Sequence, residues 1–167
     1  SAETFDRLRE GRWHRKYGEA LYRVGEVPAS MREFRKALRM LGHADSESII
    51  GQLTNGNVEM VRQFVTRIRR RFTKVSSAAP NEALLESIRA YERLVEIQYQ
   101  RTDMPAFLLA TFRALNLAEQ YGFSSELARC YSNVSAMTSA MLLPKAADRY
   151  TQRAERVAER ANDLSTV

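Results

Sequence analysis

Three side chains in the sequence have chemistry that could be catalytic or metal-binding: two histidines and one cysteine. His14 and His43 each lack a second ligand type at a spacing that metal sites use. Cys130 stands on a predicted helix with Ala128 and Val134 nearby, which is typical of a cysteine buried as a small hydrophobic residue rather than a reactive thiol. We therefore expect structural or surface roles for these residues ahead of metal or acid–base chemistry, and no bound metal or cofactor.

Three carboxylates stand where they could support acid–base catalysis. Asp103 precedes Pro105, and this pairing favours an N-cap at the start of a helix. Glu92 and Glu96 lie one helical turn apart, which is the spacing of a solvated helix face. The sequence also lacks the Gly-x4-Gly-Lys-Ser/Thr phosphate loop. No set of residues has the spacing of a catalytic site, so we predict that this segment is not an enzyme.

Most of the net positive charge falls in one predicted helix. The chain has a formal net charge of +6, and segment 58–74, VEMVRQFVTRIRRRFTK, holds six basic residues against Glu59 alone. Apolar residues at three-to-four spacing occupy the opposite face of this segment. The charges could solvate one face of a packed helix, contact an acidic protein or lipid surface, or bind nucleic-acid phosphates. The basic residues are Arg62, Arg67, Arg69, Arg70, Arg71 and Lys74.

The composition predicts a single all-helical domain. Of 167 residues, 44% are hydrophobic and 28% charged, with only 7 Gly and 4 Pro. The chain is therefore too apolar for disorder, too poor in turn formers for a β fold, and long enough to bury a core without disulfides. No apolar run approaches the ~18 residues of a membrane helix, and the N-terminus carries no targeting signal. We expect one cytoplasmic domain over residues 1–167, excised from a larger chain.

Apolar residues at three-to-four spacing predict helical hairpins. The predicted elements are hairpins over 11–42, 82–121 and 124–162, with an inserted pair of helices over 45–73. Pro28, Pro105 and Pro144 each stand near the start of a second helix, where proline is tolerated. In the first helix we place Tyr17 and Val24 on the apolar stripe.

The first hairpin, WHRKYGEALYRVGEVPASMREFRKALRML, resembles the tetratricopeptide repeat. Gly18 matches the small residue where the two helices of that repeat cross. Ala37, Ala114 and Ala154 align with separations of 77 and 40 residues, which a period of about 39 explains. The second hairpin departs from the pattern, with Phe107 where alanine is usual. The resemblance implies an α-α superhelix, a stack of antiparallel hairpins.

Tetratricopeptide stacks place the first helix of each hairpin on a concave face, and the resemblance implies which residues lie there. Arginine recurs at the second position of all three first helices, and tyrosine at the twelfth position of two. An arginine fork binds a carboxylate at two points and tyrosine offers rigid contact area, so we expect this face to bind a protein or an acidic or mixed peptide. The predicted groove residues are Arg12, Arg15, Tyr22, Arg23, Arg89, Tyr99 and Arg129. The same face includes Glu19, Glu92, Glu96, Gln100, Ser132, Ala136, Ser139 and Ala140. The alternative is that these are ordinary solvated residues or contacts with neighbouring parts of a longer chain.

Four stretches also resemble parts of one family of larger proteins: LGHADSESIIGQL, IRAYERLVEIQY, ALNLAEQYGFSSELARCYSNVSAM and YTQRAERVAERA. They are similar to the helical region of bacterial signalling proteins that join a class III adenylate or guanylate cyclase domain to an AAA-type ATPase. No cyclase or ATPase residue carries over. The resemblance implies a regulatory module that binds a partner and the flanking domains of its parent chain. The alternative function is a nucleic-acid or anionic-membrane binder that acts through residues 58–74.

Overall fold

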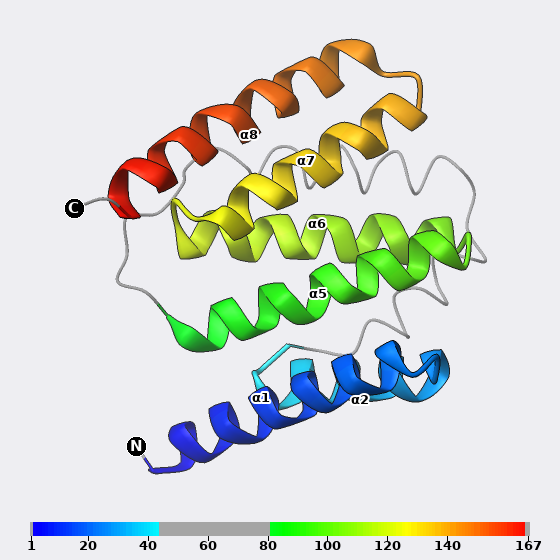
Figure 1. Cartoon of the computed structure of the whole chain (residues 1–167), viewed down its shortest axis with the longest axis vertical. Helices are drawn as coiled ribbons and strands as arrows, with labels where there is room; N and C mark the ends of the chain where they lie inside the picture. The colour runs from blue at the N-terminus through cyan, green and yellow to red at the C-terminus, as the bar shows by residue number, and fades with distance from the viewer. Residues whose placement is uncertain (1, 44–80, 166–167) are drawn as a thin grey trace.

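The computed structural model describes residues 2–43 and 81–165, and in these ranges the chain is helical without a β-strand (Figure 1). The helices are α1 (Ala2–Arg23), α2 (Val27–Met40), α5 (Glu82–Gln100), α6 (Met104–Tyr121), α7 (Ser125–Ala140) and α8 (Pro144–Ser165). The all-helical prediction is therefore confirmed for these ranges, and none of the helices described there is long and apolar enough to cross a membrane. The predicted inserted helices over 45–73, and the basic residues of segment 58–74, lie outside the described residues.

Consecutive helices pair as antiparallel hairpins, α1 with α2, α5 with α6 and α7 with α8. The hairpins contact one another in chain order, because α2 packs on α5 and α6 packs on α7, while α5 also touches α1 and α7. The connecting turns 24–26, 101–103 and 141–143 lie at the same end of each hairpin, along the right-hand side of Figure 1, and we call this side the turn end. Helix α1 begins well before the predicted residue 11, because residues 2–10 contain neither proline nor glycine to stop it.

Polar side chains cap the starts of three helices. Asn81 and Ser124 accept hydrogen bonds from backbone N–H groups in the first turns of α5 and α7. Asp103 accepts one from the N–H of Ala106 at 3.2 Å, and Pro105 occupies the first turn of the same helix. The predicted N-cap role of Asp103 is therefore confirmed, and its carboxylate is used to begin α6.

Small residues lie inside the packed helix pairs. A Cβ atom at Gly18 would come within 3.1 Å of the Phe34 ring, so α1 and α2 approach closely at this point. Ala37, Ala114 and Ala154 are all buried in the corresponding second helices. Helices can approach this closely only where the side chains between them are short.

The predicted stripe on α1 is wrong in part. Tyr17 and Val24 are exposed, and α1 instead directs Gly11, Arg15 and Gly18 inward. The glycines decide this orientation, because they are where the backbone of α1 can come nearest to α2.

Candidate functional site

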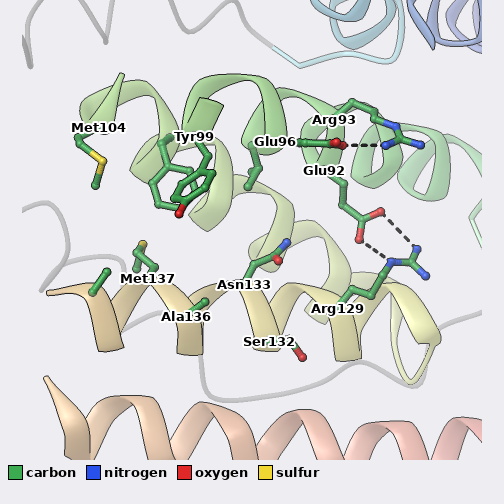
Figure 2. Close-up of a pocket in the computed structure, with 13 residues that line it drawn as sticks. Glu92, Arg93, Glu96, Tyr99, Met104, Arg129, Ser132, Asn133, Ala136 and Met137 are labelled. Carbon is green, nitrogen blue, oxygen red and sulfur yellow. Dashed lines mark hydrogen bonds and ion pairs between the residues drawn. The ribbon is translucent and has the colours of Figure 1, made fainter. Parts of the chain in front are cut away.

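A groove of about 550 Å³ lies between α5 and α7, with the first turn of α6 closing one end (Figure 2). Its walls come from α5 and α7, the first helices of the second and third hairpins. The lining residues are Glu92, Arg93, Val95, Glu96, Tyr99, Met104, Phe107, Arg129, Ser132, Asn133, Ala136, Met137 and Ala140. Apolar side chains gather at one end of the groove and charged side chains at the other.

The apolar end of the groove lies next to the turn end. Tyr99 is 67% exposed at its lip, and Met104 is also exposed. Beneath them lie the buried side chains of Phe107 and Met137, and the ring centroids of Tyr99 and Phe107 are 5.7 Å apart. A tyrosine and a methionine left in water above an apolar floor form a surface on which an apolar side chain could be buried.

The charged end of the groove is closed by ion pairs. Arg129 on α7 donates from Nε and Nη2 to the two carboxylate oxygens of Glu92 on α5, at 3.1 and 3.3 Å. Arg93 pairs with Glu96 at 2.7 Å. Burial raises the pKa of Glu92, and the hydrogen bonds from Arg129 oppose the rise. The two arginines and two glutamates balance in charge, so this end offers paired hydrogen-bonding groups and no net positive field.

Three other predicted groove arginines, Arg12, Arg15 and Arg89, join neighbouring hairpins. Arg12 pairs with Glu82 at 2.9 Å, Arg15 pairs with Glu86, and Arg89 pairs with Glu126 at 3.2 Å. These contacts link α1 to α5 and α5 to α7. The Arg15 and Glu86 side chains are only 8% and 5% exposed, so Arg15 is buried within the chain rather than presented to a partner.

Of the seven predicted groove residues, the structure places Tyr99 and Arg129 in the groove. Tyr22 lies between α1 and α5, where its hydroxyl contacts Glu96 at 3.1 Å and the Gln100 side chain at 2.9 Å. Arg23 is exposed at the turn end. Five positions of the wider predicted face also line the groove, namely Glu92, Glu96, Ser132, Ala136 and Ala140.

Sequence reasoning missed the floor of the groove. Met104 and Phe107 come from α6, a second helix, and Met137 faces inward from α7. One signal was present: Phe107 replaces the alanine usual in the repeat, and its ring now forms part of the apolar end. The other two residues had no distinguishing sequence pattern.

The two histidines, His14 and His43, each contact a neighbouring side chain of the fold. His14 Nδ1 lies 2.6 Å from Glu33, on the neighbouring helix α2. His43 packs edge-on against Tyr91 at 6.2 Å between ring centroids, and burial with the nearby charge of Arg113 lowers its pKa. In the described ranges no group of three or more His, Cys, Asp or Glu side chains is arranged to hold a metal ion.

Cys130 is 1% exposed in the core of α7. Burial and the neighbouring carboxylate of Glu92 raise the pKa of its thiol. A thiol in this setting is a packing group, because the nucleophilic form is the thiolate.

Comparison of the chain with models of protein families, with curated proteins and with solved structures gives no match.

Proposed function

We propose that this chain is a non-catalytic protein-interaction module of the tetratricopeptide-like class, and that the groove between α5 and α7 binds a peptide segment of a partner protein. The observation that carries the proposal is the apolar end of the groove, where Tyr99 stands exposed over Phe107 and Met137. Three antiparallel hairpins that pack on one another, with small residues between their helices, support the repeat class.

The ion pairs of the groove limit the kind of peptide that can bind there. Arg129 already binds Glu92 at two points, and Arg93 binds Glu96. A strongly acidic peptide would have to displace these carboxylates, at a cost similar to the contact it gained. We therefore favour a mixed peptide, with one or two large apolar side chains for the apolar end and polar groups that add to the existing pairs.

The parent chain in this proposal is a bacterial, cytoplasmic signalling protein of the cyclase and ATPase type. Stacked hairpins contact mainly their neighbours, so a bound peptide could bias the position of one hairpin relative to the next. That bias would reach flanking domains through the ends of the stack. The module would then be regulatory without a reaction of its own.

The test is selection of binders from a displayed random peptide library on the immobilised chain, followed by calorimetric titration of the enriched peptides. Ala136→Trp places an indole in the groove from an exposed position, and Ala20→Trp adds the same group on the exposed surface of α1. We expect enriched peptides to carry large apolar residues. We also expect Ala136→Trp to weaken their binding at least about tenfold and Ala20→Trp to leave it unchanged.

Two results would contradict the proposal. One is a selection that enriches no peptide. The other is a set of peptides that bind the Ala136→Trp variant as tightly as the unaltered chain.

A further inference from the structure

The outward side of α1 carries exposed aromatic side chains. Trp13 is 59% exposed and Tyr17 is 44% exposed, and their rings stack with centroids 5.2 Å apart. Ala20 is exposed on the same side of the helix, because residues 13, 17 and 20 are spaced by about one helical turn. We call Trp13, Tyr17 and Ala20 the α1 face. A stacked tryptophan and tyrosine form a rigid apolar surface of the kind that dominates protein interfaces.

The corresponding positions of the other first helices are buried. The recurring arginines Arg12, Arg89 and Arg129 relate α1 to α5 and α7, and the same separations relate the buried alanines of the second helices. Each counterpart of the α1 face on α5 and α7 is at most 4% exposed. These counterparts are Ala90, Leu94 and Ile97 on α5 and Cys130, Val134 and Met137 on α7.

The hairpin that comes before α5 or α7 accounts for this burial. Helix α2 packs on α5 and α6 packs on α7, whereas α1 packs on its own partner α2 and on the following helix α5. One contact is printed in atomic detail by the hydroxyl of Tyr131 on α7, which donates to Glu119 on α6 at 2.7 Å. The fold therefore covers this side of a first helix twice, each time with the second helix of the hairpin before it.

The opposite end of the stack, at α8, has a polar outer side (Figure 1). The second helices α2 and α6 carry large apolar residues, at most 8% exposed, at positions where α8 carries the exposed residues Asp148 and Glu155. A polar outer side closes a stack of repeats. Helix α8 of a second copy therefore lacks the apolar side chains that would cover the α1 face. The apolar residues are Met31 and Leu38 on α2 and Leu108 and Leu115 on α6.

Charge does not select what covers the α1 face, because the charged side chains around it balance. Asp6 pairs with Arg9 at 3.2 Å, and the exposed Glu10 and Lys16 have opposite charges. Apolar contact and shape therefore decide which partner fits.

The order of side-chain sizes on the α1 face is the reverse of the order on the other first helices. On α5 the small Ala90 comes first and the large Ile97 last, whereas on α1 the large Trp13 comes first and the small Ala20 last. A helix that fits the α1 face therefore has a small residue beside Trp13 and a large apolar residue beside Ala20.

We propose that the α1 face docks the second helix of a helical hairpin of a partner protein, in the arrangement that α2 has on α5 and α6 has on α7. The partner helix carries an apolar stripe whose residue sizes complement Trp13, Tyr17 and Ala20. This surface is separate from the peptide groove, since none of these three residues lines that groove.

The test uses this chain as its own probe, displayed with one exposed stripe of α8 randomised and with Trp13→Ser. The serine removes the apolar surface of the displayed copy, and it leaves the unaltered chain as the molecule that contains the single tryptophan. Displayed chains are selected on the immobilised unaltered chain. The randomised residues are Asp148, Gln152, Glu155 and Glu159.

We expect selection to place apolar residues at positions 148, 152 and 155 and a small residue at 159. Position 159 corresponds to Glu119, which contacts Tyr131 near the start of the next first helix, so it would lie beside Trp13. A selected chain titrated into the unaltered chain should move the emission of Trp13 to shorter wavelengths, because the indole ring leaves water.

Tyr17→Ser in the unaltered chain should weaken binding of the selected chains at least about tenfold by calorimetric titration. Tyr99→Ser is the matched control, because it removes another exposed tyrosine from a first helix, and it should leave the binding unchanged. Ala136→Trp, which fills the groove, should leave it unchanged as well. Failure of the peptide groove and failure of the α1 face are therefore separate results.

Three results would overturn the proposal. The first is a selection that enriches no apolar residue on α8. The second is equal binding of the selected chains by the unaltered chain and Tyr17→Ser. The third is dimerisation of the unaltered chain in sedimentation equilibrium that Tyr17→Ser abolishes, which would make a second copy the occupant of the α1 face.

Discussion

The guanidinium of Arg129 on α7 binds both carboxylate oxygens of Glu92 on α5, at 3.1 and 3.3 Å. These residues are 37 positions apart, on the first helices of adjacent hairpins. The pair therefore joins two hairpins and also closes the charged end of the groove. Arg15 and Glu86 make the corresponding connection between α1 and α5, but they do so in the protein interior.

The two connections should differ in their effect on stability. Arg129→Ala should lower the free energy of unfolding by no more than about 1 kcal/mol, because the Arg129 side chain is 54% exposed and solvent screens its charge. Arg15→Ala should cost about 3 kcal/mol, since it leaves the buried carboxylate of Glu86 without its nearest partner. Urea denaturation of both variants measures the difference. Equal losses would mean that burial does not decide the importance of these pairs.

Gly11 and Gly18 on α1 should respond in opposite ways to alanine. At Gly18 the new Cβ would lie 3.1 Å from the fully buried ring of Phe34, which has no room to move, so Gly18→Ala should destabilise the fold by about 1 to 3 kcal/mol. At Gly11 the Cβ would lie 2.7 Å from Cγ of Leu41, so that side chain must change rotamer, and it has room to do so because Leu41 lies partly exposed at the end of α2. Gly11→Ala should therefore stabilise the helix by up to about 1 kcal/mol. The midpoints of thermal unfolding should move in opposite directions, and a gain at Gly18 would refute the close crossing with α2.

The carboxyl group of Glu119 should make stability depend on pH. Burial raises its pKa, and the hydrogen bond from Tyr131 and the charge of Arg153 only partly oppose the rise. Because the pKa is higher in the folded state, the contribution of this group to stability is complete below its unfolded value of about 4 and is lost as the pH rises through the folded value.

Glu119→Gln keeps an oxygen that can accept the hydrogen bond from Tyr131, at 2.7 Å in the unaltered chain. This variant should have a higher melting temperature than the unaltered chain at neutral pH, and the two should converge near pH 4. Glu155→Gln, a change at an exposed carboxylate on α8, is the control and should not alter the pH profile. A difference in melting temperature between Glu119→Gln and the unaltered chain that stays constant across the pH range would contradict a raised pKa for Glu119.

Cys130 should be inert in the folded chain. Its side chain is buried and its pKa is raised, so little thiolate forms and reagent cannot reach it. Ellman's reagent should react at a rate set by unfolding and reach completion in denaturant. Fast reaction under native conditions would show that α7 opens locally.

Local features of this fold were predictable because neighbouring residues decide them. The hairpins follow from apolar spacing, and the start of α6 follows from Asp103 and Pro105, which act within one turn of the helix. The start of α1 was misjudged for a related reason, since residues 2–10 lack any strong helix-breaking residue and the sequence marks no boundary there.

The orientation of α1 and the partners of its arginines required the tertiary structure. Apolar spacing placed Tyr17 on the packed face, whereas the close approach to α2 at Gly18 turned Arg15 inward instead. Arg15 then meets Glu86, which is 71 residues away. Ion pairs across hairpins depend on the stagger between helices, and patterns within one helix do not encode that stagger.

The sequence by itself determined the helical class and the face to which seven lining residues of the groove belong, Tyr99 and Arg129 among them. Only the tertiary structure decided where the groove opens and that all three recurring arginines, Arg12, Arg89 and Arg129, bind glutamates of the same chain. The physical reason is that helix formation depends on contacts three and four residues apart, whereas the groove depends on how side chains from α5, α6 and α7 fill the space between helices.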